Sequence, residues 1–209
     1  MKNYTRITVD KPELAYFTSD PHFFHENVIG FCDRPFRDAD EMNVRLIANW
    51  NAAVPQDGIV FVLGDVFWRR KEMDRCAGIM ARLNGRKWLI AGNHDGYTRD
   101  LYLEMGFEDA RDYLELSIEK RLVVCSHYPL LEWNAFYRGS WHLHGHVHGR
   151  CSHFSHRVMD VGVDANNYAP VSWGDVVKRL ENCMELDKQE MRMRGDTQTH
   201  QPYKFGLKE

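Results

Sequence analysis

The feature of this sequence that most constrains its fold is a repeated pattern in which a short apolar run ends in a polar cluster. Each run is short enough to be one buried strand, and none is long enough to be a helix of ordinary length. The clearest three runs are LAYFT at 14–18, GIVFVL at 58–63 and KWLIA at 87–91. Because open α/β sheets carry their chemistry at the carboxyl ends of strands, the pattern predicts a sheet with one functional edge.

The segments between these runs have helical spacing. Residues 38–50 place apolar side chains on one face behind an Asp cap, and residues 71–83 are a second candidate helix. This alternation predicts βαβ units in a largely parallel layer. Later, YLELSI and RLVVCS flank Glu119-Lys120 and predict an antiparallel hairpin. Two more strands are expected at 141–144 and 157–163, before a helix from Ser172 to about Asn182, so the fold class is α/β.

Length and composition are those of one folded domain. A chain of 209 residues with 44% apolar residues can bury a sizeable core. We expect a single domain at 1–186, followed by a polar tail at 187–209 without clear periodicity, peripheral or disordered.

Charge and cysteine usage restrict partners and compartment. The net charge is -3 and there is no basic block, so an extended nucleic-acid footprint is not implied. No apolar run approaches the roughly 20 residues that span a bilayer, and the first residues lack the apolar stretch of a signal peptide. Five irregularly spaced cysteines suit a reducing compartment. These observations predict a cytoplasmic protein with no membrane partner.

Five polar clusters carry candidate ligands. Taken singly, each is as easily a turn or a hydrogen-bonded core group. Taken together they supply carboxylates, imidazoles and one amide oxygen, which suit borderline to hard divalent cations better than a thiolate zinc site. The clusters are Asp20-x-His22, Gly64-Asp65, Gly92-Asn93-His94-Asp95, His127 and Gly145-His146-x-His148.

In this order the five clusters resemble those of the calcineurin-like metallophosphoesterase superfamily, over about residues 15–148. The stretches SDPHFFHENVIGFCDRPF, LNGRKWLIAGNHD, SHYPL, HLHGHVHG and VGVDANNYAPVS are similar to a small bacterial and phage branch of it. The resemblance implies a four-layer αββα sandwich of two mixed β-sheets flanked by helices, with a metal pair at the strand ends.

The resemblance also implies a role for each cluster residue. Two divalent metal ions are expected, drawn from Mn, Fe, Zn or Ni. Asp65 would bridge them, and His94 would face the substrate as the catalytic residue without binding metal. The first ion would be held by Asp20, His22 and His148, and the second by Asn93, His127 and His146.

The implied function is dinuclear-metal-dependent hydrolysis of phosphate esters by attack of a metal-bridging hydroxide. Phosphodiesters are favoured over monoesters because no glycine-rich phosphate cradle occurs in the sequence. The small chain favours a compact nucleotide-like substrate, either a phosphorylated small molecule or a short oligonucleotide. The alternatives are a nuclease acting on DNA or RNA ends and a catalytically silent metal-binding interaction protein.

Other residues near the clusters have open roles. Larger members of the superfamily often have G-D-x-x-D, whose second acid orients the catalytic histidine, but Trp68 stands at that position here. Asp95 either takes over that role or caps a helix. Substrate contacts are expected from His25, Asn27, Arg34 and His144, each with a structural role as the alternative.

Overall fold

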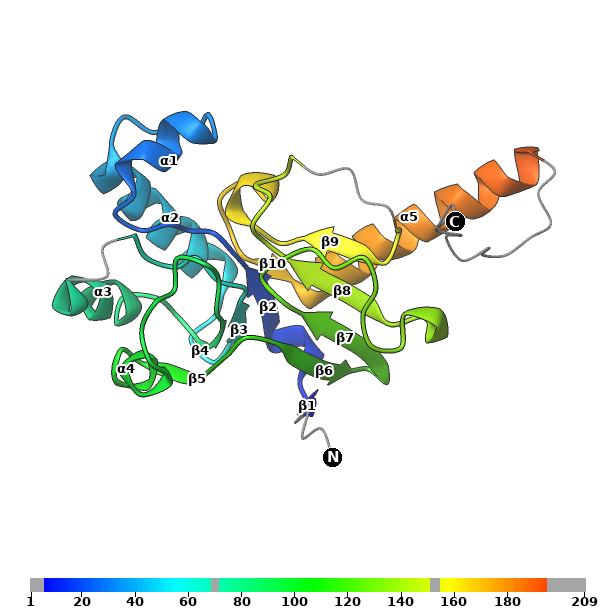
Figure 1. The fold of residues 1–209 in the computed structure, drawn as a ribbon, viewed down its shortest axis with the longest axis horizontal. Helices are drawn as coiled ribbons and strands as arrows, with labels where there is room; N and C mark the ends of the chain where they lie inside the picture. The colour runs from blue at the N-terminus through cyan, green and yellow to red at the C-terminus, as the bar shows by residue number, and fades with distance from the viewer. Residues whose placement is uncertain (1–5, 69–71, 151–154, 195–209) are drawn as a thin grey trace, which may run out of the picture.

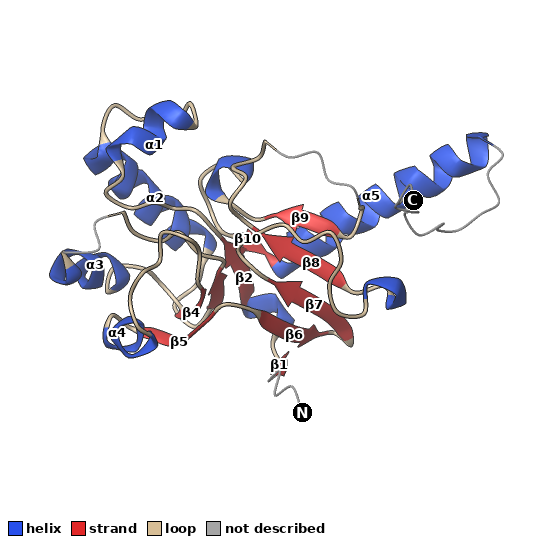
Figure 2. Ribbon diagram, viewed as in Figure 1, coloured by secondary structure: helices blue, strands red, loops and turns tan. Residues whose placement is uncertain are grey.

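The computed structural model describes residues 6–68, 72–150 and 155–194, and the side chains of the last helix only up to Met184 (Figure 1). Two five-stranded β-sheets face each other, and helices lie outside them (Figure 2). We name them sheet A, with the order β1-β6-β7-β8-β9, and sheet B, with the order β10-β2-β3-β4-β5. The expected α/β sandwich of two mixed sheets flanked by helices is confirmed.

Sheet B contains the three predicted apolar runs. β2, β3, β4 and β5 run parallel to one another, and β10 pairs with β2 in the antiparallel sense. The strands are β2 at Ala15–Thr18, β3 at Ile59–Val62, β4 at Arg86–Ile90, β5 at Phe107–Arg111 and β10 at Val171–Ser172.

Sheet A contains the predicted hairpin. β6 and β7 pair in the antiparallel sense, and Glu119 and Lys120 between them have φ values of 50° and 65°. Two central residues with positive φ define the type I′ turn, whose twist matches that of the strands. β1, β8 and β9 pair in parallel with their neighbours. The strands are β1 at Arg6–Val9, β6 at Leu114–Ile118, β7 at Arg121–Cys125, β8 at Trp141–His144 and β9 at Val158–Asp160.

Four helices lie on the sheet B side of the molecule (Figure 1). They are α1 at Glu26–Phe31, α2 at Ala39–Ala53, α3 at Met73–Met80 and α4 at Arg99–Glu104. The predicted cap of α2 is confirmed, because the Asp38 side chain accepts a hydrogen bond of 2.8 Å from the backbone N–H of Glu41. Short 3₁₀ turns are η1 at Pro12–Leu14, η2 at Phe136–Arg138 and η3 at Val163–Ala165.

The last helix, α5, spans Trp173–Arg194 and projects beyond the sandwich (Figure 1). The expected end near Asn182 was wrong, since the helix continues for three further turns. The predicted boundary after residue 186 falls within this helix, and residues 195–209 lie outside the described part of the chain. None of the described helices is both long enough and apolar enough to cross a bilayer.

Strict alternation along the strands of sheet B divides the apolar residues around that sheet into two layers. Val60 and Val62 of β3 pack under the helices, whereas Phe61 and Leu63 point between the two sheets. Phe17 on the neighbouring strand lies in the same inner layer, with its ring centroid 5.4 Å from that of Phe61.

The carboxyl ends of the two sheets meet at one edge of the sandwich. Ser19, directly after β2, forms a parallel bridge with Gly162, which follows β9 of the other sheet. The loops that carry the five polar clusters follow β2, β3, β4, β7 and β8. The fold therefore places all five clusters at the same edge.

We predict that Phe17→Ala lowers the free energy of unfolding by about 3–5 kcal/mol, because it leaves a cavity between the sheets. Phe17 has an exposed fraction of 0%. Urea unfolding measures the change, and Val44→Ala on the exposed face of α2 is the matched control. A loss for Phe17→Ala no larger than that for Val44→Ala would contradict this description of the core.

Candidate metal centre

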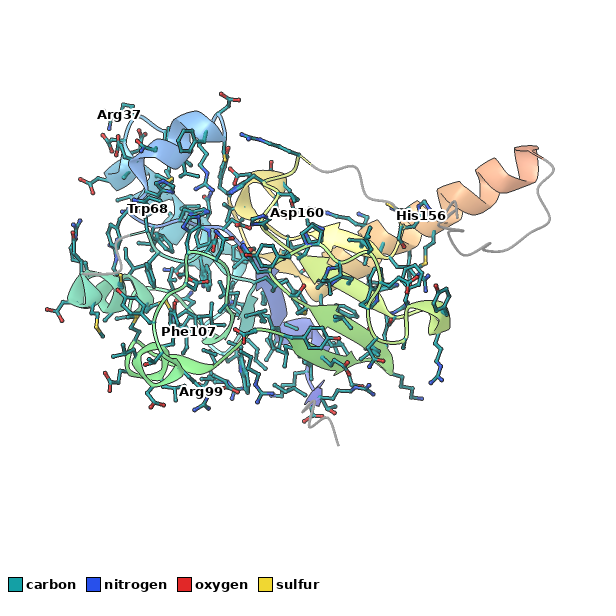
Figure 3. All side chains as sticks on the ribbon, viewed as in Figure 1. Arg37, Trp68, Arg99, Phe107, His156 and Asp160 are labelled. Carbon is teal, nitrogen blue, oxygen red and sulfur yellow. The ribbon has the colours of Figure 1, made fainter. Side chains whose placement is uncertain are left out.

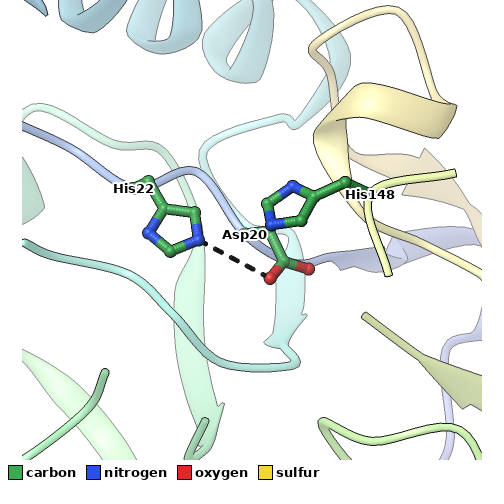
Figure 4. A group of neighbouring side chains, drawn as sticks. All are labelled: Asp20, His22 and His148. Atoms are coloured by element: carbon green, nitrogen blue, oxygen red, sulfur yellow. Dashed lines mark ion pairs between the residues drawn. The ribbon is translucent and has the colours of Figure 1, made fainter. Parts of the chain in front are cut away.

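The first group of candidate ligands comes from the loops after β2 and β8. Asp20, His22 and His148 each direct a ligand atom to one point, and these atoms lie within 4.8 Å of one another (Figure 4). The Nε2 atom of His22 is 3.9 Å from the Oδ1 atom of Asp20. The structure thus brings together the three residues expected to hold the first ion.

The second group comes from the loops after β3, β4, β7 and β8. Asp65, His127 and His146 place ligand atoms within 4.8 Å of one another. The amide oxygen of Asn93 lies 3.1 Å from the Nε2 atom of His127. The Nδ1 atom of His127 is 2.7 Å from the carbonyl oxygen of Leu63, an arrangement that holds the ring and leaves Nε2 facing the site.

Asp65 belongs to the second group and also lies next to His22 of the first group. Its Oδ2 atom is 3.6 Å from the Nε2 atom of His22 and 3.5 Å from the Nε2 atom of His127. These distances are too long for good hydrogen bonds. They do match the separation of about 3.4 Å expected between two ligands that each bind a cation at about 2.1 Å in tetrahedral geometry. One carboxylate is therefore placed where it can contact two ions.

A buried oxygen in the first group supports a bound cation. Asp20 has an exposed fraction of 0%, and its Oδ2 atom accepts a hydrogen bond of 2.9 Å from the backbone N–H of His146. Its Oδ1 atom is buried without a hydrogen-bond partner. Because a buried carboxylate oxygen without a partner is costly, the residues present fit a cation at this position.

The protonation behaviour of the cluster points the same way. Burial lowers the pKa of His22 to about 2, so its imidazole is neutral and has a lone pair for a metal. Burial raises the pKa of Asp20 to about 6. At His127, burial opposes the charged form, but the carboxylates of Asp65 and Asp20 outweigh it and raise the pKa to about 9. The two carboxylates therefore favour positive charge at His127.

Five of the candidate ligands have left-handed backbone conformations. Such φ values are uncommon outside glycine, although Asp and His tolerate them better than bulky residues, and each costs on the order of 1 kcal/mol. The surrounding structure must hold them in place, and conformations of this kind cluster at functional sites. They are Asp20 at 57°, His22 at 51°, Asp65 at 54°, His146 at 70° and His148 at 50°.

The glycines of the clusters are required by close approach. A Cβ atom on Gly145 would collide with the side chains of Ser19 and Asp20, and one on Gly92 would collide with the Asp65 carboxylate. The motifs G-D, G-N-H-D and G-H-x-H therefore bring a backbone without a side chain against a candidate ligand.

Asp95 has neither of the roles expected for it. Its carboxylate accepts hydrogen bonds from the backbone N–H groups of Asp65 at 2.6 Å, Val66 at 3.1 Å and Gly92 at 2.8 Å. Helix α4 has Thr98 as its N-cap instead. Asp95 thus joins the loops after β3 and β4, and burial raises its pKa to about 6.

Arg34 does not lie where it could bind a phosphate. It is 4% exposed, and its guanidinium forms a two-pronged contact with Asp164 at 2.8 and 2.7 Å. The same group donates to the carbonyl oxygens of Asp20 at 2.8 Å and Pro21 at 3.0 Å. The structural alternative is therefore supported for Arg34, which fixes the backbone of the first motif.

Asp164 is a site residue that the sequence reasoning missed. Its Oδ2 atom is 2.7 Å from the Nδ1 atom of His148, which orients that ring and leaves Nε2 for a metal. It lies in η3, shortly after β9, so its position after a strand could have identified it.

The other residues predicted to contact the substrate differ in how deeply they are buried. His25 is buried and precedes α1, whereas Asn27 is exposed on α1. His144 has an exposed fraction of 0%, and its Nδ1 atom is 2.8 Å from the carbonyl oxygen of Gly145. His144 therefore contacts the backbone of the last motif from a buried position. His94 is partly exposed beside the candidate ligands, as its assigned role requires.

The fold and this cluster define a class: an α/β sandwich whose Asp and His groups could hold a metal ion at the edge of its two sheets. The chain matches the family described as calcineurin-like phosphoesterase over residues 15–147. It is 32% identical over 174 residues to the uncharacterized protein MJ1445 of Methanocaldococcus jannaschii. This match covers 79% of this chain and 90% of MJ1445. The Gene 66 protein of Mycobacterium phage L5 is 28% identical over 196 residues, 80% of this chain and 91% of its own.

A solved structure has the same fold. The protein of unknown function AQ665 from Aquifex aeolicus aligns with a TM-score of 0.62 at 24% identity, over 78% of this chain and 97% of its own. The chain belongs to the calcineurin-like phosphoesterase family, and its Asp and His groups could bind metal. The expected family is confirmed.

We predict that Asp164→Asn weakens Mn²⁺ binding by about tenfold or more, because the support of His148 is disturbed. Calorimetric titration of metal-free protein measures the affinity, and thermal unfolding verifies that the variant is folded. Asp57→Asn makes the same charge change at an exposed residue and is the control. Equal affinities for the two variants would show that Asp164 does not position a ligand.

Proposed function

We propose that the protein is a dinuclear-metal-dependent hydrolase of phosphate esters, with phosphodiesters preferred to monoesters and a compact nucleotide-like substrate. The observation that carries the proposal is the position of the Asp65 carboxylate, with one oxygen 3.6 and 3.5 Å from imidazoles of two different ligand groups. A second ion would have little reason to bind without such a shared anion, because two cations repel each other.

Two bound cations would supply an activated water and neutralise charge on the phosphoryl oxygens. The protein's own part is to fix the geometry. Asp65 is held from both sides, since its backbone N–H donates to Asp95 and its Oδ1 atom accepts from the backbone N–H of His94 at 2.8 Å.

His94 is the proposed proton donor to the leaving oxygen. Its Nε2 atom is 3.8 Å from the Oδ2 atom of Asp65, and its side chain is 31% exposed. It therefore combines contact with the centre of the site and access to a substrate. A histidine in such a position can stabilise developing charge or transfer a proton to the departing alcohol.

The environment of Arg34 supports the preference for diesters. A monoester carries one more negative charge than a diester near neutral pH, and an arginine is a common means of binding it. Here the guanidinium next to the first motif is already neutralised by Asp164. It cannot supply the extra positive charge without breaking a buried ion pair.

We expect metal-stripped protein to hydrolyse bis-p-nitrophenyl phosphate after reloading with Mn²⁺, Zn²⁺ or Ni²⁺, and to hydrolyse p-nitrophenyl phosphate more slowly. Release of p-nitrophenol measures both rates. Asp65→Ala is the control, and it should lose both turnover and the second equivalent of metal. No turnover with any metal, despite two bound ions, would favour the silent interaction protein.

His94→Ala should retain two metal ions while its kcat falls by about 10²–10⁴-fold, because a positioned acid–base group contributes on this scale. Elemental analysis and kcat for bis-p-nitrophenyl phosphate separate the two effects. Loss of a metal ion from this variant would show that His94 is a ligand instead.

A further inference from the structure

Three aromatic side chains extend from the metal centre on the side of α1. Trp68, labelled in Figure 3, is 42% exposed, and Phe31 at the end of α1 is 65% exposed, although both are large and apolar. His25 lies between them, with its ring 3.7 Å from that of Trp68 at an interplanar angle of 1°. The Phe31 ring meets His25 edge-on, with centroids 6.4 Å apart. We call Trp68, His25 and Phe31 the aromatic platform.

The platform borders the proposed catalytic histidine directly. The centroid of Trp68 is 5.0 Å from that of His94, and the centroid of His25 is 6.5 Å from it. His25 is also 5.3 Å from His22, a candidate ligand of the first ion. A group attached to a phosphate at the metal centre would therefore lie next to the platform.

Two backbone contacts fix the main chain at Trp68. Its N–H donates a hydrogen bond of 3.0 Å to the carbonyl oxygen of Phe23, and Phe67 forms a bridge with the same residue. The parallel contact with His25 covers part of the indole. Exposed rings that are fixed in advance bind a planar group with little loss of conformational freedom.

We propose that the aromatic platform is a base-binding subsite, on which a nucleobase of the substrate stacks while its phosphate occupies the metal centre. This inference rests on the proposed function and names the part of a nucleotide that the site recognises. Any base can stack on an aromatic side chain, because every base has a π-face. We therefore expect higher affinity for a phosphate ester that carries a base than for one without a base, and similar affinities for different bases.

The test compares two ligands that differ by the presence of the base, adenosine 5′-monophosphate and ribose 5-phosphate. Calorimetric titration of the Mn²⁺-loaded protein gives both dissociation constants without requiring turnover. The wild type should bind the nucleotide about tenfold or more tightly than the sugar phosphate.

Trp68→Ala should remove most of this difference by weakening nucleotide binding alone, whereas Trp68→Phe should retain part of it. Tyr137→Ala is the matched control, because Tyr137 is 66% exposed but belongs to η2 and packs against Phe136. It should leave the difference unchanged. Thermal unfolding confirms that each variant is folded.

Equal affinities of the wild type for the two ligands, or a difference that survives Trp68→Ala, would overturn the subsite. These results are separate from failure of the proposed function, which would appear as absent metal-dependent hydrolysis of bis-p-nitrophenyl phosphate. Base-dependent binding without hydrolysis would retain the subsite and reject the hydrolase.

Discussion

The site depends on one electrostatic constraint: carboxylates are held among imidazoles at the edge where two sheets meet. Asp20 is buried with an oxygen that lacks a hydrogen-bond partner, and Asp65 has imidazole nitrogens around it at distances too long for hydrogen bonding. Burying a charge requires compensation from nearby opposite charge. The rest of the structure supplies the geometry in which cations can provide it.

The backbone sustains that arrangement through contacts between loops. Asp95 joins the loops after β3 and β4, whereas the Arg34–Asp164 pair joins the first motif to η3 and, through His148, to the last motif. These buried polar contacts compensate for the left-handed conformations of the ligands. Arg34, which was expected to contact a substrate, thus serves to position residues that would bind metal.

Structure was predictable from the sequence where a run of one residue type, or one spacing of apolar residues, determined the local conformation. β2, β3 and β4 were predictable because each is a continuous apolar run, and the ordered clusters after them indicated which residues would gather. β5, with the sequence FEDAR, was missed because it has one large apolar residue and three charged ones. Its pairing with β4 overrides its composition.

Contacts between distant residues were not predictable. Arg34 and Asp164 are separated by 130 positions, so no local pattern could reveal that the arginine is neutralised. The role of Asp95 was hidden for a similar reason, since its partners include backbone groups 29 and 30 residues away. Likewise, only the fold shows that Trp68 stacks on His25 next to His94.

The proposed dinuclear site requires two cations that share the Asp65 carboxylate. Anomalous diffraction from crystals of the protein loaded with Mn²⁺ would locate both cations. We predict two peaks about 3.5–4 Å apart, one beside Asp20, His22 and His148 and the other beside Asn93, His127 and His146, with Asp65 between them. A single peak, or two peaks that do not share Asp65, would show that Asp65 does not bridge two ions.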